Sequence, residues 1–538
     1  MPGEDVFDYV IAGGGSAGCV LANRLSADPR NRVLLLEGGG RDNWIWFHIP
    51  VGYLFAIGNP RADWMFRTAE EAGLNGRSLN YPRGKVLGGS SAINAMIYMR
   101  GQAADYDHWR QLGLSGWGWD DVLPVFKSVE DHSDGESAFH GAGHEWRVEH
   151  PRIRWEILDR IRDAAQAAGV PKIPDFNTGD NEGSSYFQVN QKNGRRWSAA
   201  RGFLKPALNR SNLRIETGVM VDRVNLADGR AVSVSYRKDG EAFIAKARGE
   251  VVLAAGAVGS PLILERSGIG NAGRLRAHGI EAVHHLPGVG ENLQDHLQIR
   301  PIYRVHGIKT LNTEYRNLVT RAMMGVNYAL RRRGPLTMAP SQLGAFVKSS
   351  ADHETANLEF HFQPLSLDDW GAGLHGFSAF TASVCNLRPT SRGSIHMSGP
   401  HAEDDPDIRP NYLSTEEDRR VAVESLRWAR RIVSQSALAP YRPEEFKPGA
   451  HIASDEDMLV AAGNLGTTIF HPVGTAKMGS KEDPAAVVDE RLRVRGLQGL
   501  RVIDASVMPT ITSGNTNSPT VMIAAKGAGM ILSDASSA

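Results

Sequence analysis

The sequence predicts a chain of class α/β plus α+β, in which a unit built on a parallel sheet is joined to a unit of longer alternating strands. An apolar run at Phe7–Ala12 is followed by helical spacing over Ser16–Leu25 and by a second apolar run at Arg32–Leu36. This order of strand, glycine turn, helix and strand is typical of a right-handed crossover unit, whose ligand lies beyond the carboxyl ends of the strands. Alternation at Leu358–Phe362, within residues 301–464, is typical of a half-buried strand in a second domain.

The segments between these patterns follow in order. Residues 40–100 mix aromatic residues, prolines and glycines, which predicts loops and short helices. Helical spacing appears at Trp155–Ala168, and strands return at Ala231–Tyr236 and Val251–Ala255. An amphipathic helix is expected over Asp418–Val433.

The end of the chain returns to the α/β unit. Leu500–Ile503 is a short buried strand, and Pro519–Leu532 has the spacing of a closing helix with Ser518 as its N-cap. We therefore expect the α/β unit to be assembled from three separated segments.

Composition excludes several classes of function. Lys and Arg total 60, as do Asp and Glu, so a net charge of zero gives no attraction to nucleic acid, and no nucleic-acid partner is expected. Two cysteines, Cys19 and Cys385, allow neither a disulfide framework nor a C-x-x-C pair, which fits a cytoplasmic protein. The N-terminus lacks the basic start and long apolar stretch of a signal peptide. No transmembrane segment is predicted, because the longest later apolar stretch, Val251–Leu264, is too short.

A dinucleotide-binding fingerprint lies between the first strand and the first helix. Gly13, Gly15 and Gly18 have the spacing that lets a pyrophosphate approach the helix N-terminus, and Glu37 ends the next strand, where an acid binds a ribose hydroxyl. The alternatives are a merely tight turn and an ordinary acid at a strand end. The fingerprint does not distinguish NAD from FAD.

A second glycine-rich segment, residues 84–94, reads GKVLGGSSAIN and follows Arg83. Its backbone N–H groups can lie against a planar ring or an anion, although an irregular surface loop could have the same composition. This segment resembles the first signature of the glucose-methanol-choline (GMC) family of FAD oxidoreductases. A second signature of that family is matched by residues 256–261, GAVGSP, and continues through residues 267–270, SGIG.

The resemblance runs from about residue 5 to residue 535 and implies a fold. We expect a Rossmann-like FAD-binding domain built from the discontinuous segments 1–150, 205–300 and 465–538. Residues 151–204 and 301–464 are expected to form a substrate-binding domain, based on an antiparallel sheet covered by helices.

The resemblance also implies two catalytic residues. His471 precedes a proline, which should hold it on extended backbone, and the family's catalytic histidine occupies this place. In residues 513–520, SGNTNSPT, we expect Asn517 rather than Asn515 to match the second catalytic residue, although an asparagine ahead of a helix is most often a cap. The helix opening at Pro519 should point its positive end at the reduced flavin.

Further positions are expected to bind the cofactor, each with a plausible core role as its alternative. They are Gly13, Gly15, Ser16, Ala17, Gly18, Glu37, Gly38, Trp64, Arg83, Val86, Gly88, Gly89, Asn94, Ala95, Met96, Val221, Ala255, Gly256, Asp504, Ala505, Asn517, Pro519 and Thr520.

Two departures from the family refine the expectation. Some members attach the flavin through a histidine where this chain has Ile93, so the FAD should be noncovalent. Choline-oxidising members carry a glutamate in the substrate domain where this chain has Gln342, and an amide cannot offset desolvation of a fixed cation. A neutral alcohol is therefore expected over choline, although aromatic residues could supply cation–π attraction.

The expected reaction is FAD-dependent oxidation of a primary alcohol to the aldehyde. His471 would act as general base and Asn517 would hydrogen-bond the same oxygen, while hydride passes to flavin N5. The electron acceptor, either oxygen or a quinone or carrier, is left open. The alternatives are a choline-type dehydrogenase, a flavin-retaining hydroxynitrile lyase and a noncatalytic flavin module. No ligand spacing supports a metal site joining His471 to His296 or His361, and no metal is expected.

Overall fold

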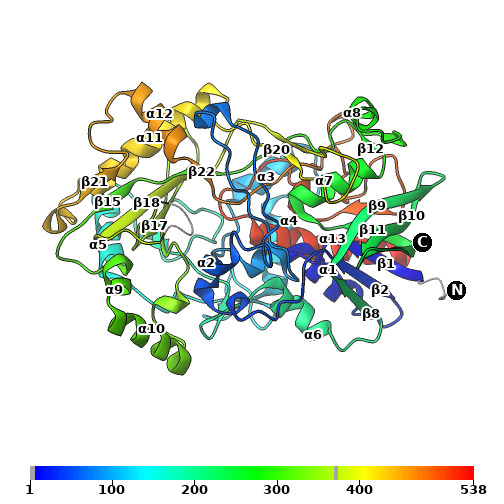
Figure 1. Cartoon of the computed structure of the whole chain (residues 1–538), viewed down its shortest axis with the longest axis horizontal. Coiled ribbons are helices and arrows are strands. Elements are labelled where there is room, and N and C mark those ends of the chain that lie inside the picture. The colour runs from blue at the N-terminus through cyan, green and yellow to red at the C-terminus, as the bar shows by residue number, and fades with distance from the viewer. Residues whose placement is uncertain (1–5, 369–372, 538) are drawn as a thin grey trace.

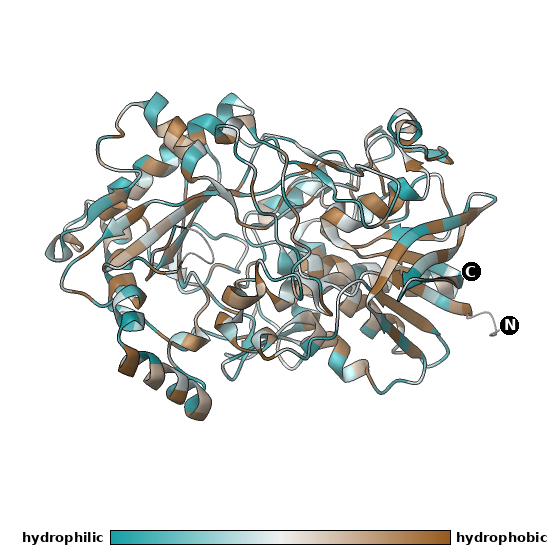
Figure 2. Ribbon diagram, in the orientation of Figure 1, coloured by the Kyte–Doolittle hydropathy of each residue, from teal (hydrophilic) through white to brown (hydrophobic). Residues whose placement is uncertain are grey.

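The computed structural model describes residues 6–368 and 373–537. Two sheets lie next to each other along the long axis of the molecule, one on the right and one on the left of Figure 1. Each sheet has its own hydrophobic core. Figure 2 shows the apolar residues concentrated in the central strands of both.

The right-hand sheet is formed by segments far apart in the sequence. Its strands, in spatial order, are β8 (Leu213–Thr217), β2 (Val33–Glu37), β1 (Val6–Ala12), β11 (Glu241–Leu253), β10 (Arg230–Lys238) and β9 (Val219–Ala227), with β23 (Leu500–Val502) also paired to β11. Strands β8, β2, β1, β11 and β23 are parallel, whereas β10 pairs antiparallel with both β11 and β9. Their carboxyl ends therefore meet at one edge, where a parallel sheet places its ligand.

Helices from both ends of the chain cover this sheet. Helix α1 (Ser16–Leu25) packs against α13 (Asn517–Ser537). The predicted N-cap Ser518 is wrong, because α13 begins at Asn517 and the carbonyl of Thr516 already accepts from the Thr520 N–H at 3.1 Å. Asn517 is thus the first residue of the helix rather than a residue ahead of it.

The left-hand sheet is antiparallel throughout. It consists of β21 (Glu444–Lys447), β15 (Ile302–Arg304), β18 (Ala379–Asn386), β17 (Leu358–Gln363), β16 (Leu343–Val347) and β5 (Gly183–Tyr186), with β14 (Leu297–Ile299) and β22 (Thr467–Thr468) attached. Helices α11 (Glu416–Val433) and α5 (Glu156–Ala167) pack on it, and α11 packs on α12 (Asp455–Leu465). Burial of the apolar faces of α5 and α11 explains why their spacing was readable in the sequence.

Shorter elements connect these layers. The remaining helices are α2 (Tyr53–Ala56), α3 (Ala103–Gln111), α4 (Trp119–Val129), α6 (Lys205–Ala207), α7 (Gly256–Arg266), α8 (Ala272–Ala277), α9 (Leu311–Arg316) and α10 (Leu318–Arg331). Single turns are η1 (Ile45–Phe47), η2 (Pro50–Gly52), η3 (Ala72–Leu74), η4 (Gly89–Ala92), η5 (Ala200–Leu204), η6 (Pro335–Thr337), η7 (Ala439–Tyr441) and η8 (Ala505–Val507). Small strands are β3 (Glu130–His132), β4 (Trp146–Val148), β6 (Gln191–Lys192), β7 (Arg195–Arg196), β12 (Ile269–Gly270), β13 (His284–His285), β19 (Ser394–His396) and β20 (Asp407–Arg409).

The predicted fold class, an α/β unit plus an antiparallel sheet covered by helices, is confirmed. The domain boundaries stay a prediction, and the sheets depart from them at two strands. β14 and β22 belong to the antiparallel sheet, although residues 297–299 and 467–468 were expected in the first domain. Among residues 6–368 and 373–537, no helix has the length and hydropathy needed to cross a membrane.

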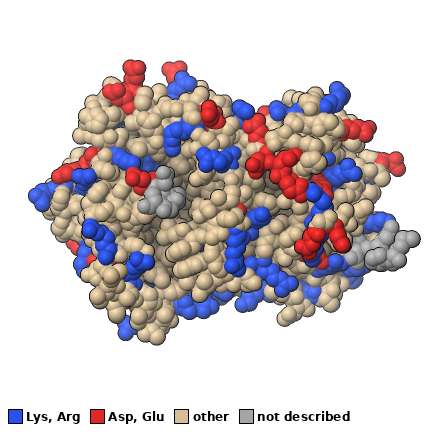
Figure 3. All heavy atoms as spheres, in the orientation of Figure 1, with Lys and Arg blue, Asp and Glu red and all other residues tan. Residues whose placement is uncertain are grey.

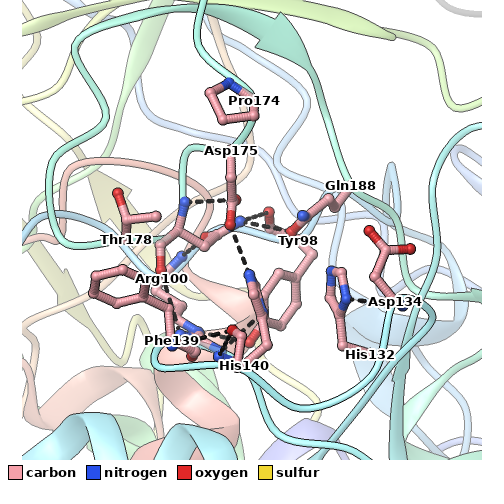
Figure 4. A network of polar contacts seen from close by, with 12 residues as sticks. Tyr98, Arg100, His132, Asp134, Phe139, His140, Pro174, Asp175, Thr178 and Gln188 are labelled. Atoms are coloured by element: carbon pink, nitrogen blue, oxygen red, sulfur yellow. Dashed lines mark hydrogen bonds and ion pairs between the residues drawn. The ribbon is translucent and has the colours of Figure 1, made fainter.

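A buried polar network ties residues 98–140 to the loop that precedes β5 (Figure 4). Arg100 is fully buried and donates to Glu130 at 2.8 Å. His140 contacts Glu130 through Nδ1 at 3.1 Å and Asp175 through Nε2 at 2.6 Å. These two carboxylates raise the pKa of His140 to about 9, against the opposing effect of its burial. The imidazolium therefore acts as a cross-link between two carboxylates within this network.

Candidate active site

A large cavity is bordered by residues of both sheets. On one side lie the first glycine loop and the ends of β1 and β2, and on the other lie Gln298 of β14 and His361 of β17. The carboxyl edge of the parallel sheet therefore opens toward the antiparallel sheet, where a ligand can contact both.

The first glycine loop has the geometry that its spacing predicted. A Cβ on Gly18 would lie 1.8 Å from the carbonyl oxygen of Gly13, so no larger residue allows this close approach of helix and strand. A Cβ on Gly15 would meet only the Cα of Gly89, at 3.9 Å, so that backbone is open to the cavity. Glu37 accepts from the N–H groups of Gly14 at 2.8 Å and Gly39 at 2.7 Å, and burial raises its pKa to about 7.

Most of the residues expected to bind a cofactor border this cavity. They are Gly13, Gly15, Ser16, Ala17, Glu37, Gly38, Trp64, Arg83, Gly89, Asn94, Ala95, Met96, Val221, Ala255, Gly256, Asp504, Ala505, Asn517 and Thr520. The structure does not place Gly18, Val86, Gly88 or Pro519 there. Gly18 and Gly88 instead allow close backbone packing, since a Cβ on Gly88 would lie 3.2 Å from that of Ala200.

Asp504 joins two motifs rather than offering a free carboxylate. Its Oδ2 accepts from the N–H of Gly256 at 2.8 Å and the hydroxyl of Ser260 at 2.5 Å. Its Oδ1 accepts from the N–H of Ser506 at 2.8 Å and the hydroxyl at 2.6 Å. The carboxylate thus fixes the second glycine motif against the C-terminal segment.

His471 borders the same cavity, on a backbone held from two directions. Its N–H donates to Oδ1 of buried Asp295 at 2.8 Å, and the hydroxyls of Tyr81, Tyr412 and Thr468 donate to Oδ2 of the same carboxylate. The preceding residue, Phe470, has φ +69°, a conformation rare for a bulky side chain, and Arg83 binds its carbonyl at 2.7 Å. The position of the imidazole is therefore determined by its neighbours.

The hydrogen bonds of His471 define its tautomer. His296 Nε2 lies 3.2 Å from the carbonyl oxygen of Leu387, which only accepts, so this nitrogen carries the proton. The Nδ1 of neutral His296 is then an acceptor for the Nδ1–H of His471, 3.1 Å away. The Nε2 of His471 is left unprotonated and accepts from Nδ2 of Asn515 at 3.0 Å.

Electrostatics keep both rings neutral. Burial, with smaller contributions from His296, His361 and Arg83, lowers the pKa of His471 well below its usual value. Burial also lowers the pKa of His296. A buried imidazole with a free Nε2 can accept a proton from a group in the cavity.

The partner of His471 is Asn515, not Asn517, which corrects the sequence-based expectation. The Oδ1 of Asn517 accepts from the hydroxyl of Ser16 at 2.7 Å, which directs this side chain toward the first glycine loop. The physical reason is the early start of α13: as its first residue, Asn517 points toward α1, whereas Asn515 lies on the loop facing His471.

Asn515 is held in place by the loop that carries it. Asp105 accepts from the N–H and the hydroxyl of Ser513, both at 2.7 Å. Asn181 donates to the carbonyl of Ser513 at 3.0 Å and in turn accepts from Gln102 at 2.7 Å. A buried polar network thus fixes this loop, two residues before the amide.

The cavity wall opposite the dinucleotide loop is polar. Gln298, Ser341, His361 and Gln363 all border it, and Gln363 donates to Ser341 at 3.1 Å. Gln342, on which the argument against choline rested, does not border the cavity; it is buried and its Nε2 points to the carbonyl of Ile153 at 3.4 Å. That sequence argument is therefore wrong about the position.

Behind this wall the described residues bring together one group of side chains of metal-ligating type: Glu359, His361 and Cys385, all buried. His361 Nε2 lies 3.2 Å from Glu359 Oε1. Burial raises the pKa of the Cys385 thiol well above its usual value, so it keeps its proton and is a poor metal ligand. The expectation of no metal stays a prediction.

Sequence reasoning missed Asp295 and Asp105, and it considered His296 and His361 only as partners of His471 in a metal site. Residues 292–296, NLQDH, place three polar side chains and a histidine directly before β14. The last three residues of this segment, Gln294, Asp295 and His296, are all buried, which is unusual for polar and charged side chains. This polar run was the available signal.

Comparison with known proteins now gives the class. Family models described as GMC oxidoreductase match residues 7–298 and 389–524. The chain belongs to the GMC oxidoreductase family and is an oxidoreductase.

Its individual relatives are full-length matches. The chain is 41% identical to alcohol dehydrogenase [acceptor] of Pseudomonas putida, over 98% of this chain and 96% of the relative. It is 40% identical to the mitochondrial choline dehydrogenase of Homo sapiens, over 98% of this chain and 90% of the relative. The crystal structure of pyridoxine 4-oxidase from Mesorbium loti superposes with a TM-score of 0.88 at 33% identity, covering 97% of this chain and 98% of that one. An FAD-dependent oxidoreductase from Chaetomium thermophilum superposes with a TM-score of 0.90 at 25% identity, covering 98% of this chain and 100% of that one. Membership of the GMC family and this structural neighbour support FAD as the cofactor.

Proposed function

We propose that the protein oxidises a neutral primary alcohol to the aldehyde, using noncovalently bound FAD, with His471 as general base and Asn515 as its partner. The observation that carries this proposal is the unprotonated Nε2 of His471, which borders the cavity beside the amide of Asn515.

The residues at the other end of the cavity fit FAD. The open backbone at Gly15 and the carboxyl of Glu37 suit a pyrophosphate and a ribose. The Nδ2 of Asn517 is a buried donor without a described partner, and it borders the cavity at the N-terminus of α13, where an anionic ring would be stabilised. Ile93, which also borders the cavity, has no atom that could form a covalent link, and so supports noncovalent binding. When bound, FAD would supply the acceptor for the hydride.

The chain's own residues would then do three things. His471 Nε2 would take the hydroxyl proton, and the Nδ2 of Asn515, now hydrogen-bonded to that nitrogen, would donate to the substrate oxygen. His296 would hold the tautomer that keeps Nε2 free. General-base assistance of this kind is typically worth about 10² to 10⁴ in rate.

The charges around the cavity support a neutral substrate. Among the described residues that border it, the carboxylates are Glu37 and Asp504, and both are hydrogen-bonded to backbone N–H groups. Neither carboxylate is among the groups that shift the pKa of His471. A fixed cation would therefore lose its hydration without gaining a carboxylate partner there.

The test is anaerobic stopped-flow reduction of the bound flavin by two alcohols of the same shape. Choline and 3,3-dimethylbutan-1-ol differ in a single atom, a quaternary nitrogen in place of a quaternary carbon. We expect the neutral alcohol to reduce the flavin with the higher second-order rate constant. Faster reduction by choline would reject the neutral-substrate part of the proposal and favour a choline dehydrogenase.

The same experiment covers the remaining alternatives. If neither these nor other alcohols bleach the flavin while a cyanohydrin is cleaved, the redox proposal fails and a lyase is indicated. Admitting oxygen to the reduced enzyme then identifies the acceptor: rapid reoxidation indicates an oxidase, and slow reoxidation with fast transfer to a quinone indicates a dehydrogenase.

A further inference from the structure

Helix α10 exposes an apolar face that nothing in the described residues covers. Val319, Met323, Val326 and Leu330 are 73%, 57%, 47% and 79% exposed. They follow one another at intervals of four, three and four residues, so they form a single stripe along the helix. Met324 and Tyr328, on the opposite side, are buried and attach α10 to the protein, with the Tyr328 hydroxyl donating to the carbonyl of Gly194 at 3.2 Å.

The helix and the residues at its two ends are basic. Arg321 and Arg331 lie within α10, Arg316 precedes it, and Arg332 and Arg333 follow it, whereas residues 315–333 contain no Asp or Glu. No ion pair joins any of these five to a described residue. From outside the helix, Arg195 and Arg201 lie close enough to act on Tyr328 electrostatically, together with Arg332. Asp42 acts on Arg201, and Glu314 precedes the basic segment, but the arginines outnumber these acids. The surroundings of the stripe therefore carry an excess of positive charge.

A second apolar group adjoins this helix. Ile45, Leu54 and Phe55 are 60%, 45% and 46% exposed on η1 and α2. Turn η2 lies between these two elements and packs on η6, which directly follows α10 and packs on it. In Figure 1, α10 and α2 lie in the lower half of the molecule. Figure 2 shows brown stretches along α10, between pale and teal ones, and Figure 3 shows Lys and Arg predominating along the lower edge.

We propose that α10, with the adjoining η1 and α2, is a docking surface for an anionic lipid bilayer. A helix with an outward apolar stripe and flanking arginines lies in the plane of a membrane interface, with its apolar side chains among the acyl chains and its guanidinium groups at the headgroups. A bilayer is the occupant that satisfies both features at once.

Charge argues against a second copy of the chain as the occupant. A two-fold contact through α10 would place each protomer's arginines against the same arginines of the other. Like charges brought together in this way oppose association. An anionic surface, by contrast, would neutralise all of them.

The docking surface lies beside the cavity. Tyr53 of α2, Ile57 just after it, and Pro340, shortly after η6, all border the cavity that holds His471. A bilayer against this surface would therefore lie next to one wall of the candidate active site. This inference does not depend on which alcohol is oxidised.

The test is flotation of the purified full-length protein with vesicles of phosphatidylcholine alone or with about one third phosphatidylglycerol, at low and high salt. We expect the protein to float with the anionic vesicles at low salt and to be released by salt. The double variant Val319→Asp/Leu330→Asp should reduce the floated fraction about ten-fold or more, because it places charge where acyl chains would lie. Arg331→Glu/Arg333→Glu should reduce flotation with the anionic vesicles at low salt and leave any flotation with phosphatidylcholine alone unchanged.

The matched control is Val283→Asp/Val460→Asp, which adds the same charges at two exposed valines, 58% and 50% exposed, away from α10. It should float like the unmodified protein, and circular dichroism checks that all variants are folded. The proposal is overturned if the unmodified protein ignores both kinds of vesicle, or if Val319→Asp/Leu330→Asp floats normally. It is equally overturned if light scattering shows a dimer that this variant converts to a monomer.

Discussion

The Nδ1 atoms of His471 and His296 lie 3.1 Å apart, so a single proton lies between the two imidazole rings. Because His296 Nε2 carries its own proton toward the Leu387 carbonyl, the proton between the rings belongs to His471. The unprotonated nitrogen of His471 is consequently Nε2, which accepts from Asn515. A histidine that does not border the cavity thereby determines which nitrogen of His471 can act as a base.

Replacement of His296 should test this control. His296→Leu removes the acceptor and allows the wrong tautomer, so we expect flavin reduction by the alcohol to slow at least about ten-fold. His296→Asn offers an amide oxygen to the same Nδ1–H and should recover much of the rate. If the Leu and Asn variants are equally slow, His296 has only a packing role.

The pH dependence of the unmodified enzyme tests the same base. It must be unprotonated, so activity is present above the pKa of His471 and is lost as the pH falls through it. Burial holds that pKa well below its usual value, so activity should persist on the acid side of neutrality. An acid limb of kcat/KM that lies at or above the ordinary pKa of histidine would contradict the assignment.

Substitution of the base itself should separate chemistry from cofactor binding. His471→Ala should lower the rate constant of flavin reduction by about 10² to 10⁴ while the protein retains its flavin, because the imidazole borders the substrate end of the cavity. His451→Ala, at an exposed histidine, is the control and should be unaffected. Normal reduction by the His471→Ala enzyme would rule out its role as base.

The two asparagines should give different phenotypes. Asn515→Ala should slow flavin reduction about ten- to a hundred-fold with the flavin retained, since it removes a hydrogen bond to an oxygen that gains charge. Asn517→Ala removes the contact with Ser16 and a donor beside the cofactor end of the cavity, so it should weaken flavin binding more than the rate. Titration of the apoproteins with FAD, alongside stopped-flow reduction, measures both. The reverse pattern would restore Asn517 as the catalytic partner.

The buried His140 predicts a pH dependence of stability rather than of activity. Its pKa is raised from 6.5 to about 9, so its contribution to stability is complete below pH 6.5 and is lost as the pH rises through about 9. The contribution is on the order of 3 kcal/mol, from a pKa difference of about two to three. His140→Gln should therefore lower Tm strongly at pH 6 and much less near pH 9.5. An equal loss of Tm at both values would show that the charge has no part in stability.

Local patterns were sufficient to predict much of the fold, but not the contacts within the site. The helix over Ser16–Leu25 has the predicted bounds, because its glycines and apolar positions are dictated by neighbours close in sequence. The pairing of His471 with His296 joins residues 175 positions apart, and no periodicity reports such a contact. The expectation of Asn517 over Asn515 differs from the hydrogen bonding of His471 for a subtler reason. It depended on where α13 begins, and helix ends are the least predictable part of a helix.

Strand β23 and helix α13, from the last forty residues, complete the sheet and the glycine loop that the first forty residues begin. Without residues 500–537, α1 would lose the helix that packs on it and β11 would lose a neighbouring strand. Apolar side chains of the dinucleotide-binding unit would then face water, so a cut before residue 500 should destabilise a loop nearly five hundred residues away along the chain.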